Sequence, residues 1–218
     1  MTAIDHETVD THEMVVVHRA LRREARLLPE LVAAVTPGDT ARARVLAGHF
    51  RDYRLGLHNH HGGEDELLWP LLLARVDLDA EVVLRMEVQH ERIAATLGRL
   101  DAAVAAWEAT AGAGERDVLV AALVEHRTVL DEHLDDEEAD LLPLAARHLS
   151  AREWGALGEH LVANTPKLTL FTLFGLVLED ADAGERAMIL AGLPRPVRMI
   201  WHALGRPRHA RRMRRVRG

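Results

Sequence analysis

Residues 60–70 read HHGGEDELLWP, and a similar stretch, HLDDEEADLLP, recurs at residues 133–143. Each copy has a His, a Glu four positions later, a second acid directly after that Glu, and a Pro preceded by apolar residues. Matching positions are 73 residues apart throughout, as His60 is from His133 and Glu64 is from Glu137. An internal repeat of this kind indicates that the chain contains two similar units.

The repeated His and Glu have the spacing of a metal-ligand pair. Residues four apart on a helix lie one turn from each other on one face, so both side chains can reach the same point. The repeat extends to a preceding segment, where His18 corresponds to His90 at an offset of 72 residues. Four antiparallel helices would bring four His and two Glu residues to one interior, which suits iron, manganese or zinc. The predicted ligands are His18, His60, Glu64, His90, His133 and Glu137.

These motifs resemble the hemerythrin family, and more narrowly its HHE cation-binding branch, over about residues 8–149. The resemblance implies a non-haem di-iron centre in a four-helix bundle, with manganese or zinc as less favoured metals. It also implies that Glu64 and Glu137 bridge two irons, that each iron takes two of the four His residues, and that an oxo or hydroxo bridge completes five of six positions. The open position would take a small molecule.

The sequence departs from the oxygen-carrying hemerythrins in two places. Those proteins have a second His one turn along the third helix, whereas Met86 and Ala94 occupy that spacing around His90 here. They also place a bridging Asp five residues after the His of the fourth helix, a position taken here by Glu138, directly after Glu137. Both departures put reversible oxygen carriage in doubt and favour a more open centre.

Four further residues lie near the predicted ligands. His61 and Glu138 are candidates for additional coordination, although His61 sits about 100° round the helix from His60 and could equally face away. Tyr53 and His126 also obey the 73-residue offset, two turns before a ligand His. They could form a second shell around the ligands, but the slightly favoured alternative is that they fill the interior with their polar atoms satisfied. His49 is a weaker candidate for the same role.

The remaining histidines break the repeat and are expected on the surface. They are His6, His12, His58, His148, His160, His202 and His209.

Composition and periodicity predict an all-α protein of two parts: an antiparallel up-and-down four-helix bundle over residues 1–149 and a helical C-terminal extension over residues 150–218. The bundle helices are expected at about residues 11–35, 39–74, 79–108 and 115–148. A capping box at Ser150 to Glu153 predicts a fifth helix to Asn164. Shorter helices are expected at about residues 183–191 and 196–204.

The chain of 218 residues has no Cys, so disulfides and thiolate metal sites are excluded. Residues 1–194 carry 18 basic and 34 acidic side chains, a net charge of −16, whereas nine Arg and no acid follow from Arg195. The N-terminus lacks a secretory signal, so a cytoplasmic protein is expected.

Two segments of the extension allow several readings. The apolar stretch within residues 166–178 is too short to span a bilayer, and it is expected to pack on the bundle or to form a homo-oligomer contact, with insertion at a membrane surface as a minority reading. The Arg-rich residues 206–217 are expected to be mobile, and either solvated or folded back on the acidic bundle. Binding to nucleic acid or to anionic lipid is a less favoured alternative, because no recognition motif accompanies these residues.

Three functions share the predicted site. The first is a binding protein or sensor for oxygen, nitric oxide or peroxide. The second is an enzyme that turns over peroxide, reduces nitric oxide or oxidises ferrous iron, and the third is an iron reservoir or donor. Acid–base groups near the ligands are limited to Tyr53, His61 and Glu138, so the sequence does not decide between them.

Overall fold

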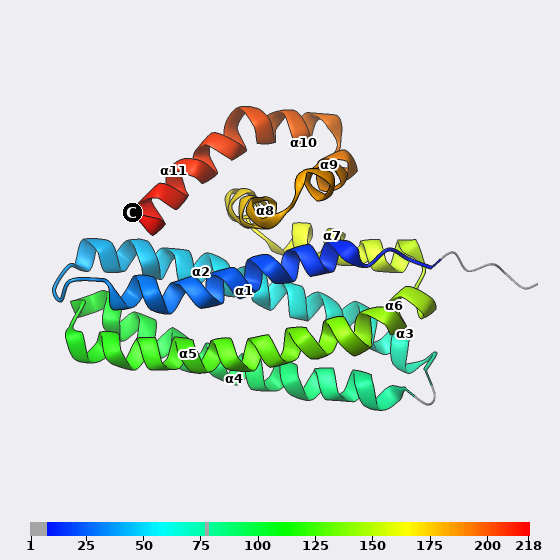
Figure 1. Ribbon diagram of the computed structural model, residues 1–218, viewed down its shortest axis with the longest axis horizontal. Coiled ribbons are helices and arrows are strands. Elements are labelled where there is room, and N and C mark those ends of the chain that lie inside the picture. Colours follow the sequence, from blue (N-terminus) through cyan, green and yellow to red (C-terminus); the bar gives the residue numbers. More distant parts are fainter. Residues whose placement is uncertain (1–7, 77–78) are drawn as a thin grey trace, which may run out of the picture.

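The structure, a computed structural model, describes residues 8–76 and 79–218, and all the regular elements among them are helical (Figure 1). The first part contains α1 (His12–Ala33), α2 (Thr40–Gly63), η1 (Glu64–Leu68), α3 (Trp69–Leu73), α4 (Ala80–Thr110), α5 (Ala113–Asp136), η2 (Glu137–Leu141) and α6 (Leu142–His148). The extension contains α7 (Ala151–Asn164), α8 (Lys167–Asp180), α9 (Ala183–Gly192), α10 (Arg195–Ile200), η3 (Trp201–Gly205) and α11 (Arg206–Arg217). The predicted all-α class is confirmed.

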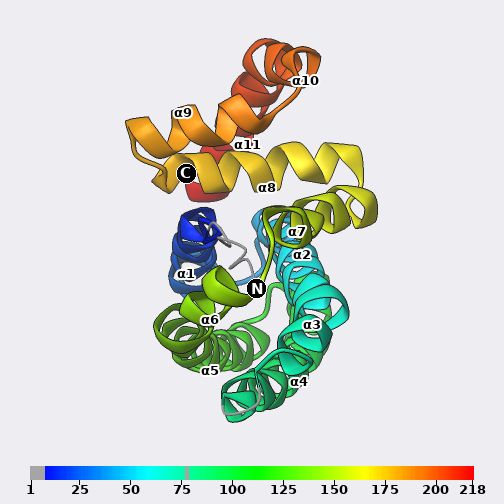
Figure 2. The same cartoon turned by 90° about the vertical axis from the view of Figure 1, so that its right-hand side faces the viewer.

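The first part is an up-and-down bundle of four antiparallel columns: α1, α2 to α3, α4, and α5 to α6 (Figures 1 and 2). Two apolar clusters fill its interior on either side of a polar layer. One cluster is formed by Met14, Leu68, Trp69, Met86, Leu141 and their neighbours. The other includes Tyr53, Leu57, Ile93, Leu97 and Leu130. The ligand candidates lie between the two sets in sequence and therefore occupy the polar layer, with an apolar cluster on each side of it.

The second and fourth columns are each interrupted by a turn of π-helix, η1 and η2. Each turn begins at a repeated Glu, and its closing hydrogen bond runs from the N–H of Trp69 to the carbonyl of Glu64, or from that of Leu142 to Glu137. A Pro follows directly in each case, and because proline lacks an N–H and clashes with the carbonyl four residues back, a local widening accommodates it. The sequence predicted two unbroken helices here, so the π turns were missed.

The extension folds back over the bundle. The predicted capping box is present at Ser150, where α7 begins. Helix α8 then crosses α1 and α2 (Figure 2), with Leu176 and Leu178 buried. The apolar stretch therefore packs on the bundle, as one of the readings expected; a homo-oligomer contact through residues 166–178 stays a prediction. None of the described helices is both long enough and apolar enough to cross a lipid bilayer.

The prediction of a mobile tail is wrong. Residues 206–217 form α11, whose Met213 and Val216 are buried against the bundle. Arg212 pairs with Asp52 at 2.5 Å, and Arg217 pairs with Glu24 at 3.1 Å. Opposite charge on the bundle and two buried apolar side chains fix the helix, so the tail folds back on the acidic bundle.

The expectation for the remaining histidines holds only in part. His12, His58 and His202 are exposed, while His148 and His160 are half-buried. His209 is buried and its Nε2 lies 2.8 Å from Glu179, so the surface expectation is wrong there. His6 lies outside the described residues.

Candidate metal centre

All six predicted ligands meet in the polar layer of the bundle. His18 comes from α1, His60 and Glu64 from the second column, His90 from α4, and the last two, His133 and Glu137, from the fourth column. Five of the six are buried, and the His60 side chain keeps only 10% of its surface exposed.

Each of the two glutamates lies close to two histidines from different helices or turns of the polar layer. Glu64 Oε1 lies 3.5 Å from His60 Nε2, and its Oε2 lies 3.6 Å from His90 Nε2. Glu137 Oε2 lies 3.3 Å from His18 Nε2 and 3.5 Å from His133 Nε2. Two ligands at right angles around an ion about 2.1 Å from each are about 3 Å apart, so these separations suit shared metal coordination.

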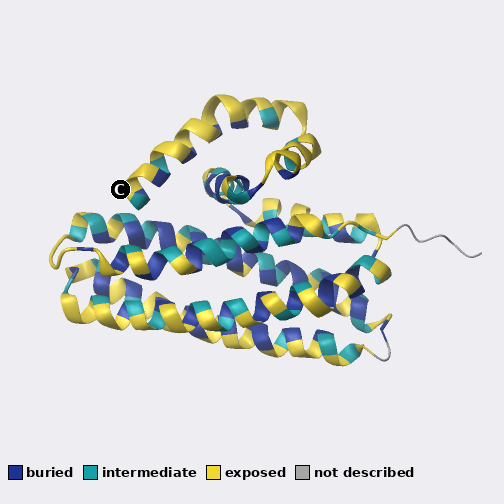
Figure 3. Cartoon of the chain, viewed as in Figure 1, coloured by how far each residue is buried: buried dark blue, intermediate teal, exposed yellow. Residues whose placement is uncertain are grey.

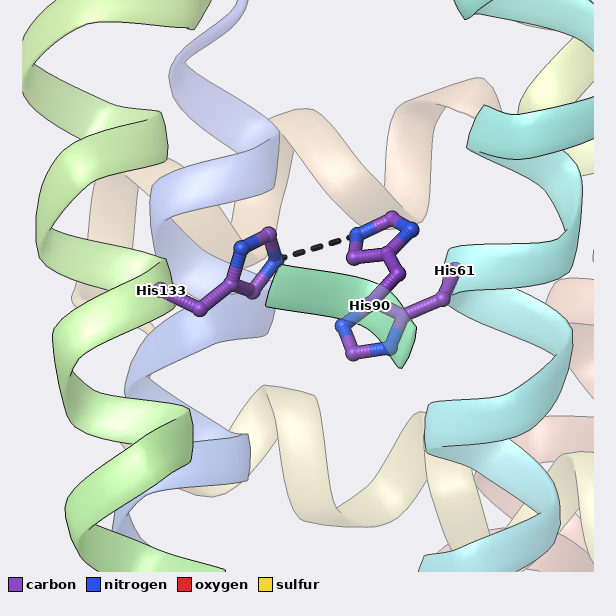
Figure 4. A group of neighbouring side chains, drawn as sticks. All are labelled: His61, His90 and His133. Carbon is purple, nitrogen blue, oxygen red and sulfur yellow. Dashed lines mark hydrogen bonds between the residues drawn. The ribbon is translucent and has the colours of Figure 1, made fainter. Parts of the chain in front are cut away.

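The side chains form groups that fit two ions. His18, His60 and Glu137 offer ligand atoms within 4.8 Å of one another, and so do His61, His90 and His133. A third group, His60, His61 and Glu64, shares His60 with the first group and His61 with the second. In the second group the rings of His61 and His90 are stacked with centroids 4.1 Å apart (Figure 4). The structure therefore turns His61 towards the centre. Each glutamate has one His neighbour from each of the first two groups.

Acceptors behind the ligand rings fix their tautomers. Nδ1 of His18 lies 3.0 Å from Glu138 Oε1, and Nδ1 of His90 lies 2.7 Å from Asp65 Oδ1. A carboxylate only accepts, so each Nδ1 carries the proton and donates it. Each Nε2 then has its lone pair free for a metal.

His133 is fixed in the same way. Its Nδ1 lies 3.2 Å from Gln89 Oε1, because the amide nitrogen of Gln89 donates to Asp136 at 2.8 Å. Burial lowers the pKa of His133 to about 2, so the ring is neutral. With Nδ1 protonated on both rings, the Nε2 lone pairs of His90 and His133 face each other across 3.2 Å (dashed in Figure 4). Two facing lone pairs repel unless a cation binds both, so this contact fits a metal ion.

Several ligand atoms have no hydrogen-bond partner among the described residues. They are Nε2 of His18, His60 and His61, both carboxylate oxygens of Glu64, and Oε2 of Glu137. Burial raises the pKa of Glu64 well above its usual value, with the charge of Glu137 as the next cause. Burial likewise lowers the pKa of His60 and His61 well below theirs. Unpaired polar atoms buried together cost several kcal/mol each, on the order of 2–7, and a bound cation would remove that cost. The residues present therefore fit a metal centre.

A family model described as the hemerythrin HHE cation binding domain matches residues 9–145, more than half of the chain. The chain belongs to the hemerythrin HHE family. No curated protein and no solved structure matches it. An HHE domain is a cation-binding unit, so the protein has a metal-binding domain, and the His and Glu groups of the bundle fit that role.

Tyr53 and His126 bond to each other in the next layer of the HHE bundle. The Tyr53 hydroxyl lies 2.8 Å from His126 Nε2, and His126 Nδ1 lies 2.7 Å from the hydroxyl of Thr96. That hydroxyl donates to the carbonyl of Ile93, so it accepts from Nδ1–H, and Tyr53 therefore donates to Nε2. Burial lowers the pKa of His126 to about 4, which keeps it neutral. The polar atoms of the pair are satisfied.

Sequence reasoning missed the supporting residues Asp65 and Gln89 and placed Glu138 among candidate ligands. The repeat contained a signal for Asp65 and Glu138, because an acid directly follows the repeated Glu in both copies. The structure places both behind a lone His of the opposite half. Gln89 has no counterpart, since Val17 occupies the matching position.

Proposed function

We propose that this HHE protein holds two non-haem irons between Glu64 and Glu137 and binds a small molecule there, either a diatomic gas such as oxygen or nitric oxide, or peroxide. One observation carries the proposal: each glutamate lies within 3.6 Å of one His from each of two groups. Carboxylates so placed suit a bridging role.

The proposed ligands divide unequally between the two irons. His18 and His60 would hold one iron, while His90, His133 and His61 would hold the other. The iron pair supplies redox chemistry and an open position for a small ligand. The iron held by two histidines would have fewer protein ligands, which favours that side for binding of a small molecule.

Binding is better supported than turnover or storage. Turnover of peroxide or nitric oxide needs a proton donor or acceptor within hydrogen-bond reach. Of the candidates, Tyr53 donates to His126, Glu138 accepts from His18, and His61 belongs to the ligand set. A reservoir needs ready release, whereas these ligands are almost fully buried.

Metal content per chain, measured with the visible spectrum after expression in iron-supplemented medium, tests the centre. Two irons and a ferric charge-transfer band are expected. Glu64→Ala and His133→Ala should each lower the iron content sharply. Glu66→Ala is the matched control, because Glu66 is exposed and lies two residues after Glu64, outside the ligand set. Equal loss in all three variants, or a single tightly held zinc, would contradict the proposal.

The loaded protein then separates the three functions. A stable spectral change on adding oxygen or nitric oxide to the ferrous protein supports binding. Catalytic loss of peroxide would show an enzyme instead, and rapid transfer of iron to a weak chelator would show a reservoir.

A further inference from the structure

The last helical column, residues 195–217, has two different faces. This column, called the C-terminal rod here, comprises α10, η3 and α11. One stripe of every fourth residue, Trp201, Gly205, His209 and Met213, is buried. Trp201 stacks on Phe171 of α8 with ring centroids 6.4 Å apart, and His209 contacts Glu179 of α8 at 2.8 Å. The inward face is therefore fixed to the molecule.

The first half of the outward face is apolar. Met199 is 71% exposed, Leu204 66%, Ile200 44% and Val197 40%. Helix α10 lies on the side of the molecule away from the bundle (Figures 1 and 2), and its outer surface is exposed (Figure 3). Neighbouring exposed apolar side chains on one helix mark an interaction surface.

The second half of the outward face is cationic. Six arginines of the rod are exposed, and none has an ion-pair partner in the described part of the chain: Arg195, Arg206, Arg208, Arg211, Arg214 and Arg215. The rod itself contains no acid. This contrasts with Arg212 and Arg217, which point inward and pair with Asp52, Glu24 and Glu179. The inward arginines hold the rod in place, so the outward ones are free for a partner.

The two halves lie along one line of the helix. Met199, Leu204, Arg208, Arg211 and Arg215 follow one another at spacings of three to five residues, which keeps them on one side of a helix that widens once at η3. A surface that offers apolar side chains and unpaired arginines together matches a layer whose outer part is anionic and whose inner part is apolar.

We infer that the outward face of the C-terminal rod binds the surface of an anionic lipid bilayer. The arginines pair with anionic headgroups, while Met199, Ile200 and Leu204 enter the boundary between headgroups and acyl chains. Nucleic acid would satisfy the arginines but would leave the apolar half in water, and for this reason lipid is the favoured partner. The rod lies along the surface and does not cross it.

Sedimentation of the full-length protein with lipid vesicles tests this inference. We expect binding to vesicles of phosphatidylglycerol and phosphatidylcholine in equal parts, weakened by salt, and little binding to pure phosphatidylcholine. Arg211→Gln with Arg215→Gln should weaken binding about fivefold per arginine removed. Met199→Ser with Leu204→Ser should weaken it about tenfold or more.

Two double variants serve as matched controls. Arg44→Gln with Arg147→Gln removes the same charge from exposed sites on the bundle, and Val88→Ser with Val118→Ser removes exposed apolar surface there. Both should bind vesicles like the parent protein, and circular dichroism should show all four variants folded. Absence of vesicle binding, or equal loss in the control variants, would overturn the inference. So would unchanged vesicle binding by the serine variant with full competition from a DNA duplex, which would make the rod a nucleic-acid surface.

Discussion

Glu138, in the second half of the repeat, accepts a hydrogen bond from Nδ1 of His18, in the first half, at 3.0 Å. The same relation joins Asp65 to His90 at 2.7 Å. Each acid directly follows the repeated glutamate of one half and accepts a hydrogen bond from the lone His of the other half. Each acid contacts the Nδ1 side of its imidazole and leaves Nε2 free, so we expect its effect on a bound metal to be indirect.

Glu138→Ala should weaken iron binding about 10–100-fold while leaving two irons per chain at saturation, because His18 loses the acceptor that fixes its tautomer. Competition with a chelator of known affinity measures the change. Asp135→Ala is the control, since Asp135 pairs with the same Arg22 but contacts no ligand. An iron content that falls to one at saturation would mean that Glu138 is itself a ligand.

His61→Ala should lower iron affinity and shift the visible spectrum, because one iron would lose its third imidazole. His58→Ala, an exposed change on the same helix, should do neither. Metal titration followed by spectroscopy checks both variants. Identical behaviour of the two would remove His61 from the ligand set.

Tyr53→Phe should destabilise the fold by about 1–3 kcal/mol, because the buried Nε2 of His126 loses its donor. Urea denaturation measures the free energy of unfolding, and the iron content should remain at the parent level. If iron is lost from folded Tyr53→Phe protein, the tyrosine supports the centre as well as the core.

Glu24 should make the fold sensitive to acid. Burial alone would raise its pKa, but the hydrogen bond from His49 at 2.8 Å and the nearby Arg23 charge outweigh it and lower the pKa from 4.5 to about 2. A lowered pKa in the fold means that this stabilisation is complete above about pH 4.5 and is lost as pH falls towards 2. Arg217 of α11 also contacts Glu24, so the extension shares the effect.

At neutral pH, Glu24→Gln should therefore lower the free energy of unfolding by an amount on the order of 2–3 kcal/mol. The difference between variant and parent should shrink as pH falls from 4.5 towards 2. Thermal unfolding at a series of pH values measures it. A difference that stays constant across that range would exclude the ionised Glu24 as its source.

Two glycine substitutions should act in opposite directions. A methyl group at Gly175 of α8 would meet the ring of His209, so Gly175→Ala should loosen α11 and expose its arginines to trypsin. A methyl group at Gly155 of α7 meets no atom within 4 Å, so Gly155→Ala should stabilise the helix by up to about 1 kcal/mol. Limited proteolysis and thermal unfolding distinguish the two. Equal resistance to trypsin in both variants would mean that α11 does not depend on the close contact at Gly175.

The bundle and the convergence of the six predicted ligands could be predicted from sequence because both depend on spacing along a helix. The His to Glu interval of four residues sets one face, and the 73-residue repeat supplies the second copy. His61 could not be decided in this way. One position round the helix from His60, it reaches the centre through its stacking on His90, a residue of another helix.

The other misses also concern contacts between residues far apart in sequence. Glu24 lies 25 residues before His49, and Glu179 lies 30 before His209, so no local pattern joined either pair. The π turns depend on how two helices tolerate Pro70 and Pro143. The fixed tail depends on Asp52 and Glu24, which belong to the bundle.

The crossed arrangement of Glu64 with His90, and of Glu137 with His18, gives the centre an approximate twofold axis. Neither half holds a complete set of ligands, so a single half-chain would need a second copy of itself to build the site. The symmetry is broken at one position, since Leu134 occupies the place that corresponds to His61. A dimer of the first half would thus carry an additional imidazole on both sides and a dimer of the second half on neither, while the joined chain would make the two proposed metal positions chemically distinct.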